Sequence, residues 1–285
     1  EEVGRNLAGV AVTPDGSKVY VTSFVSPGFV SVIDTGTDAV VASVAVDKIP
    51  RGVAVTPDGS KVYVASVTFS ATPGTVSVID TAANVVLRTF EVGRSPFGVA
   101  VTPDGGKVYV ANGGGASVSV IDTAAGTVGT IGLATGASGV AVTPDGSKVY
   151  VVTGGGNGVA VIDTATDTVV GSPIAVGNAP RGVAVTPDGS KVYVANANSG
   201  TVSVIDTASN TVVRTIPVGS QPIAFGLFIQ PAKAKFAGTP GQANCGGKSV
   251  SALARHYGGM SAAARALSYA GVDALQEAIG TFCKG

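Results

Sequence analysis

The sequence has little of the side-chain chemistry that enzymes most often use. It has 285 residues but a single histidine, one methionine and no tryptophan. A metal site built from several histidines is therefore excluded within one chain, and a Ser-His-Asp triad would depend on His256 alone. We interpret His256 as a surface or packing residue, and we predict no catalytic residues, no metal site and no cofactor.

Charge and long apolar runs are scarce as well. Only 13% of the residues are charged, and the 18 basic and 18 acidic residues leave no net charge. Without an overall basic field, nucleic acid is not an expected partner. The apolar runs, such as Val40–Val46, are about seven residues long, whereas a membrane helix needs about 20. No membrane span is predicted.

Glycine and valine dominate a unit that recurs five times. The unit reads GVAVTPDGSKVYV, then a variable loop, then VSVIDT and a last apolar run; its first glycines are Gly9, Gly52, Gly98, Gly139 and Gly182. A period of 40–45 residues with four strand-like runs is typical of a propeller blade. In repeat five the expected strands A to D are 182–186, 191–195, 201–206 and 211–216. Turn residues such as Thr186–Gly189 (TPDG) separate them, and Pro217 suits the end of strand D. The predicted fold is an all-β propeller of four-stranded antiparallel blades.

The repeats closely resemble the YVTN family of β-propeller repeats. The run that gives the family its name is present as YVTS, YVAS, YVAN and YVVT, starting at Tyr20, Tyr63, Tyr109, Tyr150 and Tyr193. The resemblance covers roughly residues 3–231. It implies a propeller, commonly exported or surface-located in bacteria, but it implies no single activity, because propellers host many.

A sixth unit begins but does not continue. The stretch QPIAFGLFI, with a predicted closing strand at 223–229, matches strand A, and Ala224 takes the place of the glycine. The stretch EEVGRN (Glu1–Asn6) matches the end of a strand D. One hypothesis is a sixth blade shared between the two ends and completed by residues upstream of Glu1. The alternative is a five-bladed ring in which the strand adds to an edge. The chain begins at Glu1 rather than Met, which is consistent with a processed chain and a removed export signal.

The expected domains are a propeller at 1–231, a Gly/Pro/Ala linker at 232–247 and a helical tail at 248–285. Val272, Leu275, Ile279 and Phe282 lie on one stripe of a tail helix. Short helices have little apolar core, so a covalent link that stabilises them is expected. Cys245 and Cys283 flank the helices and could form it. Their disulfide would be worth about 4 kcal/mol on the chain-entropy model and would indicate the periplasm or the cell exterior. The alternative is two free thiols.

Three glycine-rich stretches fail as nucleotide sites. Gly246–Ser249 (GGKS) lacks the first glycine of a phosphate-binding loop, and the loops 112–117 and 153–158 join two strands rather than a strand and a helix. Two aspartates recur in every repeat, and so does one tyrosine. Carboxylate-only calcium sites are possible in principle, but repetition in every blade favours a structural role for these residues.

Function is expected where the repeats differ, in the D–A and B–C loops, which share one face of a propeller. Aligned cations make this loop face mildly positive, and aromatic residues accompany them. The predicted ligand-binding residues are Arg5, Lys48, Arg51, Arg94, Phe97 and Arg181, with Phe24 and Phe69 on the same face. The alternative is that these are solvated side chains covering apolar surface.

The leading interpretation is an exported, non-enzymatic scaffold that binds a protein or an anionic ligand through the loop face. It would be periplasmic, secreted or on the cell surface. A lactonase- or lyase-like propeller enzyme is the first alternative, although strand A offers almost only glycine, valine and alanine. A structural cell-surface or adhesion protein is the second. The sequence does not determine the oligomeric state.

Overall fold

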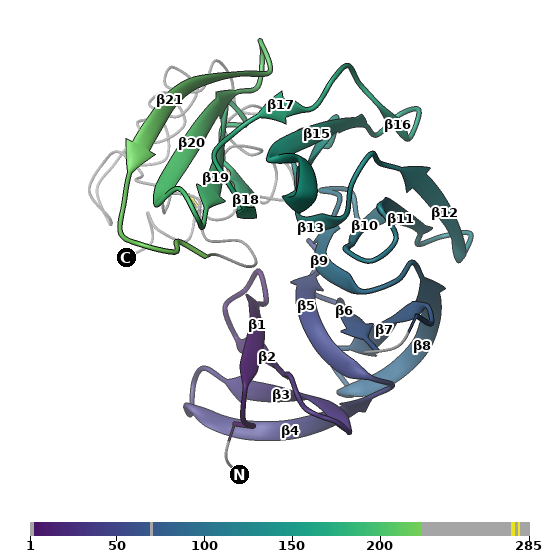
Figure 1. Cartoon of the computed structure of the whole chain (residues 1–285). Helices are drawn as coiled ribbons and strands as arrows, with labels where there is room; N and C mark the ends of the chain where they lie inside the picture. The colour runs from purple at the N-terminus through teal and green to yellow at the C-terminus, as the bar shows by residue number, and fades with distance from the viewer. Residues whose placement is uncertain (1–2, 69–70, 224–274, 277–278, 280–285) are drawn as a thin grey trace, which may run out of the picture.

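A computed structural model describes residues 3–68, 71–223, 275–276 and 279. Its strands form five antiparallel sheets, and chain order is also spatial order within each sheet. The sheets are arranged as blades around a common axis, and Figure 1 looks along that axis. The predicted all-β propeller architecture is therefore confirmed. We number the blades 1 to 5 along the chain.

The strands have the following bounds. Blade 1 holds β1 (Leu7–Val12), β2 (Lys18–Ser23), β3 (Gly28–Asp34) and β4 (Ala39–Val46). Blade 2 holds β5 (Ile49–Val55), β6 (Lys61–Val67), β7 (Gly74–Asp80) and β8 (Val85–Val92). Blade 3 holds β9 (Pro96–Val101), β10 (Lys107–Asn112), β11 (Ser117–Asp122) and β12 (Thr127–Gly132). Blade 4 holds β13 (Ala137–Val142), β14 (Lys148–Thr153), the 3₁₀ turn η1 (Gly154–Gly156), β15 (Gly158–Asp163), β16 (Thr168–Val169) and β17 (Ile174–Ala175). Blade 5 holds β18 (Pro180–Val185), β19 (Lys191–Asn196), β20 (Thr201–Asp206) and β21 (Thr211–Pro217).

The first strand of each blade is innermost. The inner strands contact one another in the order β1, β5, β9, β13 and β18. In blade 4 the outer strand is interrupted, and both β16 and β17 pair with β15. The strands expected for repeat five agree with β18–β21 within two residues at every end, and β21 does end at Pro217.

The repeated aspartates build the turns, as their repetition indicated. Between β5 and β6, Asp58 accepts hydrogen bonds from the Thr56 hydroxyl (2.5 Å) and the Ser60 amide (3.0 Å). Between β7 and β8, Asp80 accepts from the amides of Ala82 (2.9 Å) and Ala83 (2.7 Å). Such side-chain-to-backbone bonds specify tight turns. Equivalent aspartates bond in the same way in the other blades.

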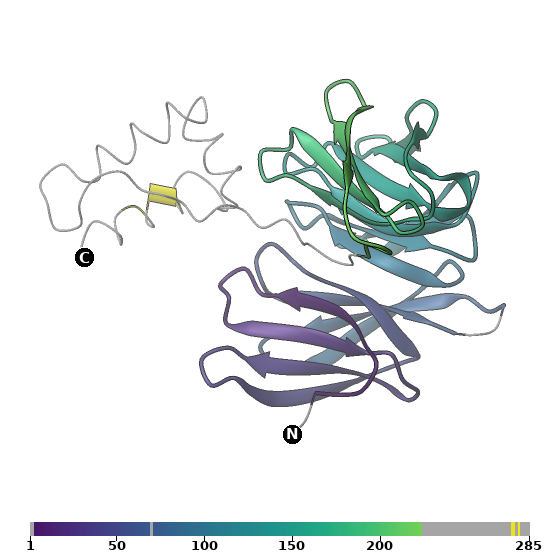
Figure 2. The same ribbon diagram turned by 60° about the vertical axis from the view of Figure 1, so that its left-hand side comes forward.

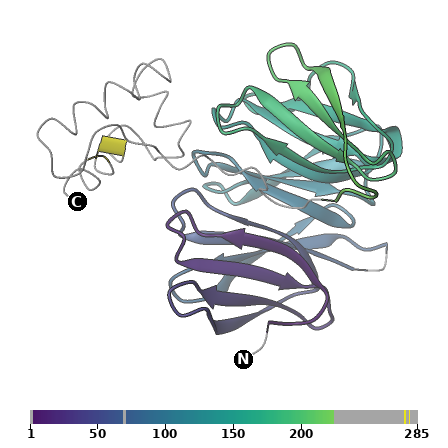
Figure 3. The same ribbon diagram turned by 90° about the vertical axis from the view of Figure 1, so that its left-hand side faces the viewer.

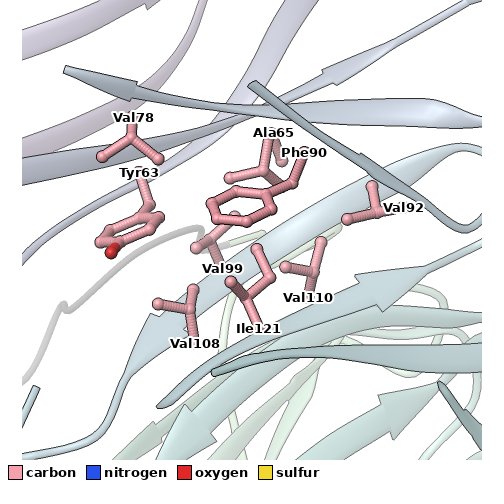
Figure 4. Packing of buried hydrophobic residues seen from close by; sticks show 10 residues of the cluster. Tyr63, Ala65, Val78, Phe90, Val92, Val99, Val108, Val110 and Ile121 are labelled. Atoms are coloured by element: carbon pink, nitrogen blue, oxygen red, sulfur yellow. The ribbon is translucent and has the colours of Figure 1, made fainter. Parts of the chain in front are cut away.

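The core consists of four apolar clusters, one between each pair of successive blades. Figure 4 shows the cluster between blades 2 and 3, where Tyr63, Val78 and Phe90 face Val108 and Ile121. Because strand side chains alternate between faces, each interior blade contributes one apolar face to either neighbour. A blade thus contacts only its neighbours, as in other stacked repeats.

Hydrogen bonds between polar side chains of successive blades reinforce these interfaces on the face opposite to the D–A and B–C loops. We call these pairs polar staples. The Tyr109 hydroxyl of blade 3 donates to Asp167 of blade 4 at 2.6 Å, and Lys107 Nζ binds the same carboxylate at 2.7 Å. Tyr150 of blade 4 donates to Asn210 of blade 5 at 2.7 Å. Tyr20, Tyr63, Tyr109 and Tyr150 are buried at these interfaces and serve blade packing, as the sequence indicated, whereas Tyr193 of blade 5 is partly exposed.

The acceptor of each staple is the last residue of the turn between strands C and D. This position has positive φ in all five blades: Asp38 (53°), Asn84 (55°), Gly126 (67°), Asp167 (52°) and Asn210 (53°). Asn, Asp and Gly are the residues that tolerate this left-handed backbone. At the interface of blades 2 and 3 the acceptor is missing, because the residue is Gly126. There Arg88 Nη2 donates to the Gly126 carbonyl at 2.9 Å instead.

The glycine that begins each repeat allows the inner strands to approach closely. A Cβ atom on Gly98 would lie 2.8 Å from the Ser138 carbonyl oxygen, and one on Gly139 would lie 2.9 Å from the Arg181 carbonyl oxygen. Real Cβ atoms do not approach backbone oxygens so closely. The contact therefore requires glycine, and this explains its recurrence.

The described residues leave the ring open between blades 5 and 1. In the described part of the chain no packing comparable to that of the other inner strands joins β18 to β1. Figures 2 and 3 show blade 1 (purple) and blade 5 (green) as separate sheets on either side of this opening. We call it the seam. The closing strand expected at 223–229 lies outside the described residues apart from Ile223, so both hypotheses for it stay open.

Most of the C-terminal prediction also lies outside the described residues. This applies to the linker at 232–247, to Cys245 and Cys283 and to His256. Leu275, Gln276 and Ile279 are described and are helical. Leu275 and Ile279 are buried, as expected for the stripe that they share.

Candidate functional site at the loop face

A β-bulge presents one side chain of each inner strand at the loop face. In blade 2, Pro50 pairs with Ser66 and Val53 with Val64, so Arg51 and Gly52 together oppose a single residue of β6. The same irregularity follows Pro96 in blade 3 and Pro180 in blade 5. A bulge bends the strand and redirects a side chain. This local geometry places Arg51, Phe97 and Arg181 at equivalent positions.

Arg51 lies between two aromatic rings. Its guanidinium carbon is 4.3 Å from the centroid of the Phe24 ring and 4.2 Å from that of the Phe97 ring. Phe24 comes from the B–C loop of blade 1 and Phe97 from β9 of blade 3. Three neighbouring blades therefore build one stack. A cation over an aromatic face gains about 0.5–2 kcal/mol per ring, so the rings fix the guanidinium plane.

The guanidinium is partly desolvated and has no counter-ion among the described residues. Burial, and secondarily repulsion from Arg181, lower the pKa of Arg51 below its ordinary value. It stays charged, because arginine titrates far above neutral pH. Its Nε atom is buried without a hydrogen-bond partner among the described residues. The one ion pair in the described ranges joins Lys107 and Asp167 instead. Arg51 is thus a charge held in place with unused donor capacity.

A central cavity of about 2930 Å³ runs along the inner strands. Arg51, Phe24 and Phe97 line it at the loop face, while Gly98 and Val99 are among the small apolar residues that line its wall. The stack therefore lies where the cavity reaches the loops. A ligand entering from this face would meet a cation between two rings, followed by an apolar wall.

The structure brings together only some of the predicted site residues. Arg51 and Phe97 are in contact, and Arg181 is near enough to affect the pKa of Arg51. Lys48 instead donates to the Pro73 carbonyl of its own blade at 2.9 Å. The side chains of Arg5 and Arg94 are exposed, and neither residue lines the cavity.

The second aromatic partner of Arg51 was not among the six predicted binding residues. Phe24 was noted as an aromatic on the same face, and Phe69 lies outside the described residues. In the sequence, only the aligned cations of the D–A loops pointed to this site. The B–C loops differ in sequence and length, so no alignment of repeats indicates which aromatic reaches Arg51.

The described ranges contain no group of three or more His, Cys, Asp or Glu residues that could hold a metal ion. No helix in these ranges is long and apolar enough to cross a membrane. A fixed cation beside aromatic surface suits a planar anion such as a carboxylate, which a guanidinium binds through two parallel hydrogen bonds.

The sequence matches the Choice-of-anchor I domain over residues 8–219. No curated protein sequence matches the chain. Among solved structures, hydrazine synthase of Kuenenia stuttgartiensis aligns with a TM-score of 0.55 and 21% identity, covering 78% of this chain and 90% of that one. A functionally unknown protein of Desulfotomaculum acetoxidans aligns with a TM-score of 0.69 and 23% identity, covering 81% and 76%. At such identities the two structures support the fold alone.

Proposed function

The chain belongs to the Choice-of-anchor I domain family, and from this premise we propose that it is a non-enzymatic propeller scaffold that binds an anionic group at Arg51. The anion belongs to a ligand or to an acidic segment of a partner protein. The observation that carries the proposal is the Arg51 guanidinium between Phe24 and Phe97, with no counter-ion among the described residues.

An extracytoplasmic location is part of the proposal. The family description, which refers to an anchor, supports a cell-surface or secreted protein. The resemblance of the repeats to the YVTN family supports the same location and adds the periplasm as a possible compartment. An exported scaffold with a fixed cationic site on one face is suited to recognition rather than catalysis.

Binding of an acidic probe tests this function. Poly-L-glutamate, titrated by calorimetry at 20 mM and 300 mM NaCl, should bind the wild type and bind more weakly at the higher salt concentration. Arg51→Ala combined with Arg181→Ala should weaken binding about 10- to 100-fold, because a hydrogen bond to a charged group contributes about 1.5–3 kcal/mol.

Arg214→Ala is the matched control, because Arg214 is an exposed arginine on the outer strand β21. It removes one charge without touching the stack and should leave the affinity within about twofold. Equal losses in the Arg214 variant and the double variant would show a diffuse charge effect and refute the proposed site. No binding by the wild type at either salt concentration would refute the proposed function.

A further inference from the structure

The two blades beside the seam expose faces that are covered in every other blade. In β1, Val10 is 52% exposed and Val12 is 51% exposed, whereas the equivalents of Val10 in blades 2 and 5, Val53 and Val183, are 6% and 5% exposed. On the other side, Tyr193 of blade 5 is partly exposed, while Tyr109 is fully buried. Each face is thus the kind that elsewhere in this chain packs against another blade.

The glycine that follows β21 also lacks, among the described residues, the neighbouring strand that its equivalents contact. Gly93 and Gly177 follow strand D of blades 2 and 4, and a Cβ atom on either would collide with Asn112 or Asn196 at the end of the next blade's second strand. Gly219 is the equivalent residue after β21, and a Cβ atom there would meet nothing within 4 Å. In the described residues the position beyond Gly219 is therefore empty of a neighbouring second strand.

After β21 the backbone nevertheless makes the same turn that precedes the inner strands β9 and β18. Ser95 and Ala179 have φ of 49° and 51°, and each precedes the proline that begins β9 or β18. Gln221 has φ of 51° and precedes Pro222. A non-glycine residue with positive φ is uncommon. Its recurrence at this position indicates that the chain is directed inward again after β21.

We propose that the seam is a docking surface for residues 222–229 of this chain, which occupy the inner-strand position between β18 and β1. The stretch matches the inner strands in sequence, with Phe225 in the place of Val99, a residue buried between blades. The known inner strands each contact the first two strands of the preceding blade. Residues 222–229 then cover β18 and β19, and the remaining face of blade 1 is left for a sheet of the same repeat chemistry.

One residue makes this strand differ from the other inner strands. Ala224 stands where the repeats have glycine, and on Gly98 a Cβ atom would lie 2.8 Å from the carbonyl oxygen of the next inner strand. In the same position, the Ala224 methyl group keeps the strand from approaching β1 as closely as its equivalents approach their neighbours. The seam is therefore the loosest of the inner-strand contacts.

Substitution of Ala224 in the full chain tests the placement. Ala224→Gly should raise Tm by a few degrees, because it removes the methyl group that opposes close approach. Ala224→Val should lower Tm. In an unpacked segment neither change matters, and in an ordinary strand glycine is unfavourable. A Tm that falls or stays constant in the Ala224→Gly variant would overturn the proposal.

Hydrogen–deuterium exchange locates the effect. Phe225→Asp places a charge at the position of a buried valine and should raise amide exchange in β18 and β19 about tenfold or more, because local opening sets exchange rates. Phe236→Asp makes the same change outside the proposed strand and should leave both strands protected. Equal exchange in the two variants, whether raised or not, would contradict docking of residues 222–229 at the seam.

Discussion

The Tyr109 hydroxyl of blade 3 donates a hydrogen bond of 2.6 Å to the Asp167 carboxylate of blade 4. Burial raises the pKa of Tyr109, and the bond to Asp167 raises it further. Lys107 binds the other carboxylate oxygen at 2.7 Å. One side chain of a turn thus satisfies two donors of the preceding blade, and the staple fixes how the two blades are aligned.

Removal of this acceptor should destabilise the protein. Asp167→Ala leaves the Tyr109 hydroxyl without its acceptor and leaves the Lys107 ammonium with only the Thr164 carbonyl, so the free energy of unfolding should fall by about 1–3 kcal/mol. Urea denaturation measures it. Asp38→Ala is the control, because Asp38 has the same backbone conformation (φ 53°) in an exposed turn. If the control loses as much stability, the backbone rather than the staple carries the effect.

Substitutions of Arg88 in blade 2 and Gly126 in blade 3 should have coupled effects on stability. Arg88 packs against Gly126, where a Cβ atom would meet its guanidinium. Gly126→Asn alone should therefore destabilise, while Gly126→Asn with Arg88→Ala restores a staple acceptor for Tyr63. The double-mutant cycle should give a favourable coupling of about 1 kcal/mol. Additive effects of the two substitutions would contradict this interpretation.

Close approach of the inner strands predicts a sharp difference between two glycines. Gly98→Ala should cost about 1–3 kcal/mol, because the new methyl group would lie 2.8 Å from the Ser138 carbonyl oxygen. Gly132→Ala, on the outer strand β12, meets nothing within 4 Å and should change stability by less than about 0.5 kcal/mol. Thermal unfolding of both variants distinguishes the two cases.

Stability should fall in acid through the aspartate turns. Hydrogen bonds from Thr56 and Ser60 lower the pKa of Asp58 from 3.8 to about 2, and those from Thr13 and Ser17 lower that of Asp15 to about 2. Because the folded pKa lies below the unfolded one, this contribution is complete above about pH 4 and is lost as the pH falls towards 2. Tm measured from pH 5 to pH 2 should show the decrease. The decrease should be shallower when Asp15 and Asp58 are both changed to Asn, and an unchanged profile in that variant would exclude these turns as the cause.

Charge alone should not replace Arg51. Arg51→Lys keeps the positive charge but loses the planar group that stacks on Phe24 and Phe97 and pairs with a carboxylate. It should lose most of the affinity for poly-L-glutamate that Arg51→Ala loses. Arg181→Lys, at an exposed position, should bind nearly as well as the wild type. Equal affinity of the Arg51→Lys variant and the wild type would show that only the field of the loop face matters.

The fold was predictable because the same pattern of strands and turns recurs in every repeat. The spacing of Gly9, Gly52 and Gly98 reflects the close approach of inner strands, and the recurring TPDG marks a turn that Asp58 and its equivalents build. These signals are local or periodic, so a single sequence reveals them. The opening between blades 5 and 1 was indicated by two features of the sequence, a sixth repeat that stops after strand A and the stretch Glu1–Asn6, which matches the end of a strand D.

The site was predictable in part. Alignment places Arg51 and Arg181 at the same position of the repeat, yet one is stacked between two rings and the other is exposed. The difference comes from Phe24 and Phe97, which belong to neighbouring blades. Contacts between segments of different repeats depend on loop length and bulge geometry, and the periodic pattern carries no information on either.

The staples also bear on how such a protein changes over evolutionary time. Each joins a donor of one blade to an acceptor of the next, so a blade can be excised or duplicated as a unit and the new neighbours still match. Unequal recombination between the near-identical repeats would then alter blade number without creating a new interface. Blades 2 and 3 are the exception, because Arg88 is matched to Gly126. These two blades would have to be inherited as a pair.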